Sequence, residues 1–244
     1  MSDTSALEKS VSGREQIKRL KERFRKSPCE GLSDSETLEL LLSYAMPGDT
    51  ATAARALVQR FNGFRGVFDA SMEELESTPG IKGSAAVLVK LFKGMAGIYL
   101  EERMMGRDII RSPKEAIDYL NMKLSGERVE KFLAIYLNAR NEVLAVEVLH
   151  EGTINQTAVY PRKAIERAFK HNASGIIFVH NHPSGDATPS HVDRQLTKVL
   201  DRAALAVDLI VHDHLIIGKG AHFSARDNGW IIGCPVSLRR AAED

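Results

Sequence analysis

The chain has only two cysteines among its 244 residues, Cys29 and Cys234, and they stand far apart. Neither has neighbours at metal-ligand spacing, so the sequence excludes a disulfide framework and a cysteine-based zinc knuckle. An excess of charge of one sign is missing too, because 33 Lys and Arg oppose 32 Asp and Glu and leave a net charge of +1. Overall charge therefore identifies no class of partner.

Long hydrophobic runs are also missing. No apolar stretch approaches the roughly 20 residues that a helix needs to cross a bilayer. The opening residues are polar and acidic, without the basic start and apolar core of a signal peptide. A hydrophobic content of 43% and a charged content of 27% are ordinary for a globular protein. We therefore expect a cytoplasmic protein with no membrane partner.

The pattern of the chain changes near residue 107. Before it, capping signals such as Ser33-Asp34-Ser35-Glu36 precede stretches with helical apolar spacing, and no run has the character of a strand. After it, strand-like apolar runs at 132–137 and 143–149 mix with helices. The chain is long enough for two modest domains. We predict five parts: a disordered tail at 1–13, a helical module at 14–106, a linker at 107–113, a mixed α/β domain at 114–234 and a tail at 235–244.

Two features of the helical module raise the question of nucleic acid. From Arg14 to Lys26, seven Lys or Arg stand against two Glu, a net charge of +5 that suits either a phosphate-contacting arm or a solvated helix face. The segment 75–86 resembles a helix-hairpin-helix, whose glycine turn seats a phosphate at a helix start. Lys82 replaces the second glycine of that pattern, with Gly83 one place later, so a generic helical hairpin is an equal alternative.

The most informative stretch runs from His180 to Asp193. An apolar run at 175–179 predicts a buried strand that ends at His180, and residues two apart on a strand project to the same side. The imidazoles of His180 and His182 can therefore point at one spot. A turn-rich loop follows, and a helix begins near Ser190 with Asp193 in its first turn. Three such ligands and an open fourth position are typical of a catalytic zinc site, although Ser190 and Asp193 also fit a capping box.

The complete pattern is His-x-His-Pro, six residues, Ser, two residues and Asp, which matches without a gap the JAMM motif of the MPN (JAB) metalloenzymes. From about residue 14 to 233 the chain resembles RadC-type proteins, the bacterial family named for DNA repair. Besides this stretch, the resemblance rests on Gly152-Thr153-Ile154-Asn155, Tyr160-Pro161-Arg162 and Asp213-His214. It implies an MPN fold, an α/β (α+β) domain with a mixed, curved sheet flanked by helices, preceded by a helix-hairpin-helix-like module.

The resemblance also implies roles for individual residues. It makes three residues ligands of one Zn²⁺, with water as the fourth ligand: His180, His182 and Asp193. It places Ser190 beside that water, in support of the charge that develops on the substrate oxygen. It requires a Glu at the start of the first long strand of the domain, and Glu130 stands there. Glu147 and Glu151 are rivals, and Glu147 can equally be a solvent-facing strand residue.

These roles predict a zinc-dependent hydrolase of the metalloprotease type, with a protein or peptide as its substrate. Zinc lowers the pKa of bound water to about 7. Glu130 takes the proton of that water and returns it to the leaving amine of a peptide or isopeptide bond, while Ser190 shares in stabilising the oxyanion. Zinc rather than iron or manganese rests on ligand chemistry and the resemblance, since the ligand set suits several metals.

The alternative from another class is a DNA-binding factor of repair or recombination, in which the metal domain is accessory. The basic arm and the helical hairpin favour it, whereas a site with three ligands favours the hydrolase, because structural zinc sites are usually closed by four protein ligands. A nuclease has little support, since no cluster of carboxylates can hold a pair of metals. His214 is either a residue that orients a ligand or a buried histidine satisfied by its neighbours.

Overall fold

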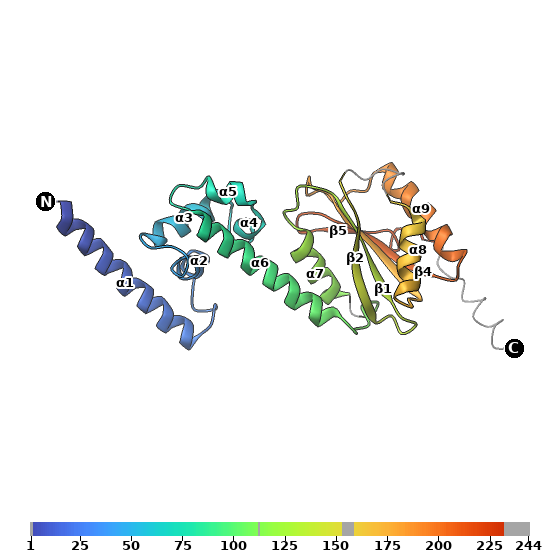
Figure 1. Cartoon of the computed structure of the whole chain (residues 1–244), viewed down its shortest axis with the longest axis horizontal. Coiled ribbons are helices and arrows are strands. Elements are labelled where there is room, and N and C mark those ends of the chain that lie inside the picture. Colours follow the sequence, from blue (N-terminus) through green and yellow to red (C-terminus); the bar gives the residue numbers. More distant parts are fainter. Residues whose placement is uncertain (1, 112, 153–158, 232–244) are drawn as a thin grey trace. The chain divides into compact units, whose positions relative to one another are not determined.

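The computed structural model describes residues 2–111, 113–152 and 159–231, and of residues 2–12 it describes the helical backbone alone. Thr153, Ile154 and Asn155, on which the resemblance partly rests, lie outside the described residues, as does the predicted tail at 235–244. The chain divides into two compact units, residues 1–95 and 96–244, and each is treated by itself. Figure 1 shows the elements of both units along the sequence.

The first unit is entirely helical over its described residues. Its helices are α1 (Ser2–Lys26), α2 (Asp34–Leu42), α3 (Thr50–Arg60), α4 (Phe64–Asp69), α5 (Met72–Glu76) and the first part of α6 (Gly83–Met104). Leucines at the centre of α2, α3 and α5 are completely buried, and they pack with Ala85, Ala86 and Val89 of α6. The predicted capping box at Ser33 and Glu36 is present, and Ser71 and Glu74 form a second one. The sequence prediction missed α4.

Helix α1 occupies the region where the sequence predicts a disordered tail at residues 1–13. The segment contains good helix formers such as Ala6, Leu7 and Glu8, whose propensity the tail prediction did not weigh. Further along α1, Leu20 is buried, and Arg23 forms an ion pair with Glu36 at 2.5 Å. Six basic side chains of the predicted arm are exposed, Arg23 among them: Arg14, Lys18, Arg19, Arg23, Arg25 and Lys26.

Helices α5 and α6 are joined by a turn over residues 77–82. Gly80 has a φ of +85°, a left-handed conformation that favours glycine. From α3, the guanidinium of Arg60 donates to the hydroxyl oxygens of Thr78 and Ser77, at 2.8 and 2.9 Å. Lys82 is exposed. Arg60 therefore holds the turn to α3.

Helix α6 carries residues of both units, which divide at residues 95 and 96, before the predicted linker at residues 107–113. Leu100 and Met104 pack in the core of the second unit, and Ile109, within the supposed linker, is 2% exposed. Asp108 forms a bridge with Glu142, which ties the segment to the sheet. A helix that continues through the boundary leaves no change in composition for sequence reasoning to detect.

By length and composition, α6 is the one helix among the described residues that could cross a bilayer, whereas no apolar run of that length is predicted from the sequence. Lys90 and Lys93 stand within it. The ammonium of Lys90 donates to the carbonyls of Phe68 and Ala70, and that of Lys93 pairs with Asp69 at 2.8 Å. The apolar window of α6 is 17% buried, and the helix contributes buried side chains to two protein cores.

Over its described residues, the second unit is built on a five-stranded mixed sheet in the order β2-β1-β3-β4-β5, as the sequence predicts for an α/β domain. Its elements are α7 (Lys114–Leu124), β1 (Lys131–Leu137), β2 (Val143–Glu151), α8 (Pro161–Lys170), β3 (Gly175–Asn181), α9 (His191–Leu205), β4 (Ile210–Ile217) and β5 (His222–Ser224). Strands β3 and β4 are parallel, with α9 as the crossover between them, and the other neighbours are antiparallel.

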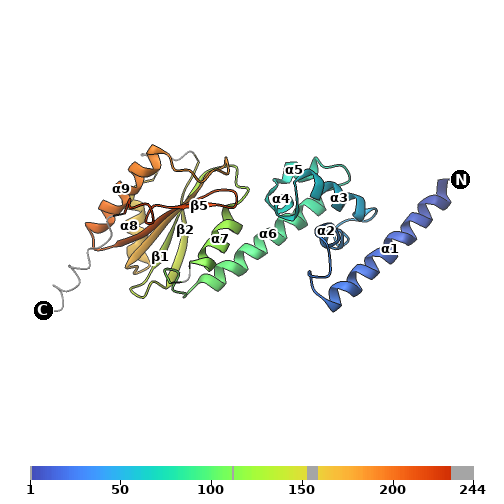
Figure 2. The same ribbon diagram turned by 180° about the vertical axis from the view of Figure 1, so that it is seen from behind.

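Helices cover both faces of the sheet (Figures 1 and 2). Leu133, Ile135 and Leu137 of β1 pack with α7, whereas Phe132, Ala134 and Tyr136 pack with α8 and α9. This alternation follows from the two-residue period of a strand. Strand β3 repeats it, so successive residues of β3 belong alternately to the two cores. The face of the sheet on which a side chain lies is therefore fixed by its register.

The loop after β3 lies against the end of β4. The His182 amide donates to the carbonyl of Ile217, and the Lys219 amide donates to that of Gly185. A Cβ on Gly218 would stand 2.5 Å from the Gly185 carbonyl oxygen and 2.8 Å from the Ala187 amide nitrogen. Only glycine at position 218 lets the loop approach this closely.

We predict that Gly218→Ala destabilises the second unit by about 1–3 kcal/mol, because the added methyl group meets backbone that cannot move without shifting the loop. Chemical denaturation of the full chain measures the change. Gly94→Ala is the matched control, since a Cβ there meets nothing within 4 Å on helix α6, and it should stabilise by about 0.5–1 kcal/mol. Equal effects of the two substitutions would contradict the assigned role of Gly218.

Candidate metal centre

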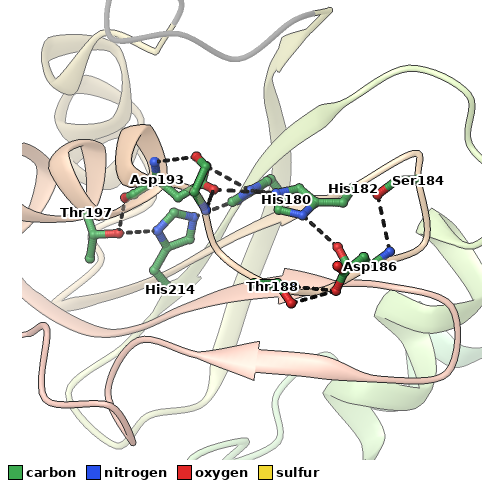
Figure 3. Close-up of polar contacts among 9 residues, drawn as sticks. His180, His182, Ser184, Asp186, Thr188, Asp193, Thr197 and His214 are labelled. Atoms are coloured by element: carbon green, nitrogen blue, oxygen red, sulfur yellow. Dashed lines mark hydrogen bonds and ion pairs between the residues drawn. The ribbon is translucent and has the colours of Figure 1, made fainter.

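Two secondary-structure elements bring the three predicted ligands together. His180 lies on β3, and His182 follows the strand by one residue, so both imidazoles emerge on the α9 side of the sheet. Asp193 is the third residue of α9, whose N-cap is Ser190. Figure 3 shows the side chains of the three residues pointing toward one another across the start of the helix.

The ligand atoms of His180, His182 and Asp193 all lie within 4.8 Å of one another. The two Nε2 atoms are 3.1 Å apart. One Asp193 oxygen stands 3.2 Å from Nε2 of His180, and the other stands 3.5 Å from Nε2 of His182. His180 and Asp193 are almost completely buried, and the His182 side chain is 15% exposed. The site thus has a buried floor and one accessible ligand.

A chain of hydrogen bonds fixes how His180 presents its lone pair. The Thr197 hydroxyl donates to the Asp193 carbonyl at 2.6 Å, so its oxygen accepts from Nδ1 of His214, also at 2.6 Å. His214 then carries no proton on Nε2, which accepts from Nδ1 of His180 at 2.9 Å. With Nδ1 committed to His214, His180 turns its Nε2 toward Asp193 and His182. Figure 3 shows this chain.

The loop orients His182 in the same way. Its Nδ1 is 2.8 Å from the backbone carbonyl of Asp186, which can only accept, so Nδ1 carries the proton. The Asp186 carboxylate in turn accepts from the amide and hydroxyl of Thr188. His182 therefore also turns its Nε2 into the site. An oxygen acceptor on the second ring nitrogen is the usual partner of a metal-bound histidine.

The electrostatics of the site favour a positive charge between the three groups. Burial raises the pKa of Asp193, but hydrogen bonds from His180 and His182, their charge and the bond with Ser190 outweigh it and hold this pKa below its ordinary value. The hydrogen bond with Asp193 raises the pKa of His182 against the effect of burial, and the Asp186 carbonyl and the charges of Asp193 and Glu130 add to it. Burial, followed by the charge of His180, lowers the pKa of His214, which stays neutral.

The donor set therefore fits a divalent cation. Two imidazole lone pairs and an ionised carboxylate converge within bonding reach of one point, and lone pairs 3.1 Å apart repel unless a proton or a metal ion stands between them. Imidazole and carboxylate together suit zinc and several other transition metals. The capping box of Ser190 and Asp193 is present too, so the capping and ligand interpretations of Asp193 hold together.

The three candidate bases lie in different places. Glu130 is half-buried and precedes β1, and its charge reaches His182. Glu147 pairs with His171 at 2.6 Å and with Arg167 at 3.4 Å, so it ties β2 to α8 instead of facing solvent or the site. Glu151 pairs with Lys131 of β1, and alternate residues of β1 from Lys131 onward lie on the face that packs with α7. The Glu151 side chain is 59% exposed. Of the three, Glu130 is the one associated with the metal ligands.

Other predicted residues lie around the site. Ser190 is exposed, and its hydroxyl accepts from the Asp193 amide at 3.2 Å. His191 and Arg162 are exposed on α9 and α8. His214 is the buried partner of His180, so its two interpretations, orientation of a ligand and satisfaction by neighbours, describe the same contacts. Sequence reasoning missed Thr197, although its position four residues after Asp193 places it on the same face of α9.

Comparison with known proteins gives two findings. A family model described as RadC-like JAB domain matches residues 110–230, a range that contains the whole sheet and all three candidate ligands. A UPF0758 protein of Nitrosospira multiformis is 40% identical over 223 residues, which cover 91% of this chain and 100% of that protein. Because it covers 91% of this chain, the second match extends over the helical unit as well, whereas the match to the family model begins only at residue 110.

We predict that Thr197→Val weakens zinc binding about 10–100-fold, because valine keeps the shape of threonine but leaves the Nδ1–H of His214 without its acceptor. Competition with a chromophoric chelator measures the affinity. Thr52→Val, the same substitution at an exposed position of α3, is the control and should leave zinc affinity unchanged. An unchanged affinity in Thr197→Val would show that the chain through His214 does not support His180.

Proposed function

Because the chain belongs to the RadC family and contains a RadC-like JAB domain, we propose that it is a zinc-dependent hydrolase of the JAMM type. The proposal names a peptide or isopeptide-like amide as the bond that is cleaved. The observation that carries it is the convergence of two oriented imidazole lone pairs and one buried carboxylate at a point with an accessible side. A structural zinc site is usually closed by a fourth protein ligand. Within the described residues, the metal-ligating group contains three members.

His180, His182 and Asp193 are the residues that would hold the metal. A zinc ion bound there supplies a water with a pKa near 7 and polarises a carbonyl. The protein orients the two histidines through His214, Thr197 and the Asp186 carbonyl. Burial of His180 and Asp193 excludes bulk water from the floor of the site, which strengthens charge interactions there.

Glu130 is proposed as the general base and acid. Phe132 pairs with His180 in the β1–β3 ladder, and extending this antiparallel register by two residues sets Glu130 opposite His182. Residues two apart share a face, so this extended register would put Glu130 on the face of the ligands. There its carboxylate can take a proton from the attacking water and pass it to the leaving amine.

Ser190 is proposed to stabilise the oxyanion. Its backbone amide donates to the Asp193 carboxylate at 2.7 Å, and its hydroxyl accepts from the Asp193 amide at 3.2 Å. The residue is exposed at the start of α9, where its hydroxyl could turn from Asp193 to donate to a substrate oxygen. A donor aimed at developing negative charge is the largest single contribution in many acyl-transfer sites.

We expect about one zinc per chain in the wild type, none in His182→Ala and the full amount in Glu130→Ala, because only the first substitution removes a ligand. Elemental analysis of untagged protein measures the content. His191→Ala controls for the loss of a histidine near the site, since His191 is exposed and contacts Gln195 instead of the ligands. A wild type that takes up no zinc when zinc is supplied would rule out the hydrolase.

Hydrolysis itself is tested with a library of internally quenched fluorescent peptides and the zinc-loaded chain. We expect cleavage that is lost on chelation and regained with zinc. Glu130→Gln should cut the rate by about 10²-fold or more without loss of metal, because proton transfer by a positioned carboxylate contributes on that scale. Retention of full activity in Glu130→Gln would remove Glu130 from the mechanism.

A second candidate function, which can coexist with the first, is DNA binding by the helical unit. It is supported by the six exposed basic side chains on α1 and by the resemblance of residues 75–86 to a helix-hairpin-helix. Such contacts would attach the chain to DNA phosphates without reading sequence. In that case the metal domain would act on, or be regulated by, a partner at the DNA.

Binding of the full chain to a labelled duplex should weaken steeply with salt, with a slope of log K against log salt of about −0.9 per phosphate contact. A triple variant on α1, Lys18→Glu, Arg19→Glu and Arg25→Glu, should abolish the shift. A control of equal charge change on α8 and α9 should keep it: Lys170→Glu, Lys198→Glu and Arg202→Glu, all exposed in the wild type. No shift of the wild type at low salt would exclude this function.

A further inference from the structure

Asn181 stands between the two histidines in the chain and is 2% exposed. Its side chain takes no part in the hydrogen bonds described above for the metal ligands. Instead, its Oδ1 accepts from the Lys131 amide at 2.8 Å, and its Nδ2 donates to the Val129 carbonyl at 3.2 Å. One buried side-chain amide therefore holds the backbone on both sides of Glu130.

These contacts occur where the backbone ladder stops. The pairing of β1 with β3 ends at Phe132 and His180. Beyond it, β3 turns into the metal loop, because the His182 amide donates to the Ile217 carbonyl of β4. In the continued register Lys131 is opposite Asn181, so the Asn181 side chain takes the place of the next backbone partner. It connects two strands that are separating.

The backbone of Glu130 is also held from its other side. The Gly152 amide, at the end of β2, donates to the Glu130 carbonyl at 2.9 Å. The residue is thus fixed between β2 and β3 before the regular strand begins. An acid–base group gains from this arrangement, since a displacement of about 1 Å in a reacting group can cost 10²-fold in rate.

We propose that Asn181 is a positioning residue that sets the distance between Glu130 and the metal ligands. The inference rests on the proposed role of Glu130. An amide suits the task because it offers one acceptor and one donor, which match the N–H of residue 131 and the C=O of residue 129. Removing it leaves two part-buried hydrogen bonds unmade, at the Lys131 amide and the Val129 carbonyl, and frees the segment to move away from β3.

The first test is hydrogen exchange of the zinc-loaded full chain, resolved at the Lys131 amide. We expect exchange to rise at least about tenfold in Asn181→Ala, because the amide loses its acceptor. Asn138→Ala is the matched control at the opposite end of β1, where the side chain accepts from the Arg140 and Glu142 amides. It should raise exchange at those amides and leave Lys131 protected.

The second test uses acetohydroxamic acid, which chelates zinc through two oxygens and gives its proton to a neighbouring base. We expect about one zinc per chain in Asn181→Ala, since no ligand is lost. Its affinity for acetohydroxamic acid should fall about tenfold, as in Glu130→Gln, because proton transfer to a positioned carboxylate is impaired in both. The double variant should lose nothing further, which separates action through Glu130 from general damage.

Asn181→Asp keeps an acceptor for Lys131 and lacks the donor to Val129, so it should restore protection of the Lys131 amide even if the alanine variant unfolds.

Unchanged exchange and hydroxamate affinity in Asn181→Ala would overturn the inference, and so would loss of zinc. If Glu130→Gln binds the hydroxamate normally while Asn181→Ala still exposes the Lys131 amide, the proposed role of Glu130 fails separately. The backbone clamp then remains, without a catalytic purpose.

Discussion

The structure of the site depends on one costly constraint, the burial of the Asp193 carboxylate among imidazoles. An ionised carboxylate is stable in a dry environment only when opposite charge and hydrogen bonds surround it. The backbone amide of Ser190 supplies one such bond, and His180 and His182 supply the interactions that hold its pKa low. The carboxylate and the two imidazoles therefore need a cation between them. The partners of the histidines orient the rings so that this cation can be a metal ion instead of a proton.

The outer partners of the ligands belong to the core of the second unit. His214 packs against Phe132 and Phe178, and its ring lies between His180 and Thr197. Its low pKa follows from that burial. The orientation of a ligand is therefore maintained by the same apolar packing that keeps the sheet together, and a change in this packing reaches the metal site through a single neutral ring.

Much of this arrangement could be predicted from sequence because it is local. His180, His182 and Asp193 lie within fourteen residues, and the periods of a strand and a helix are enough to place them together. Glu130 lies fifty residues earlier, so its association with the site needed the family resemblance. Asn181 and Thr197 could not be singled out, because their roles depend on strand register and on a contact with β4. The division of the chain within α6 was not predicted, because a continuous helix has no turn residues or change in composition at that point.

The sheet also has two unlike ends. The candidate ligands and Glu130 gather where β3 finishes, while the β1–β2 hairpin around Asn138 lies at the other end of β1, about 20 Å away for a seven-residue strand. Residues at that hairpin contact none of the groups that hold the ligands. Evolution, or an engineer inserting a reporter or an affinity handle, is thus free to lengthen the hairpin, while the edge that bears the histidines tolerates almost no change in length.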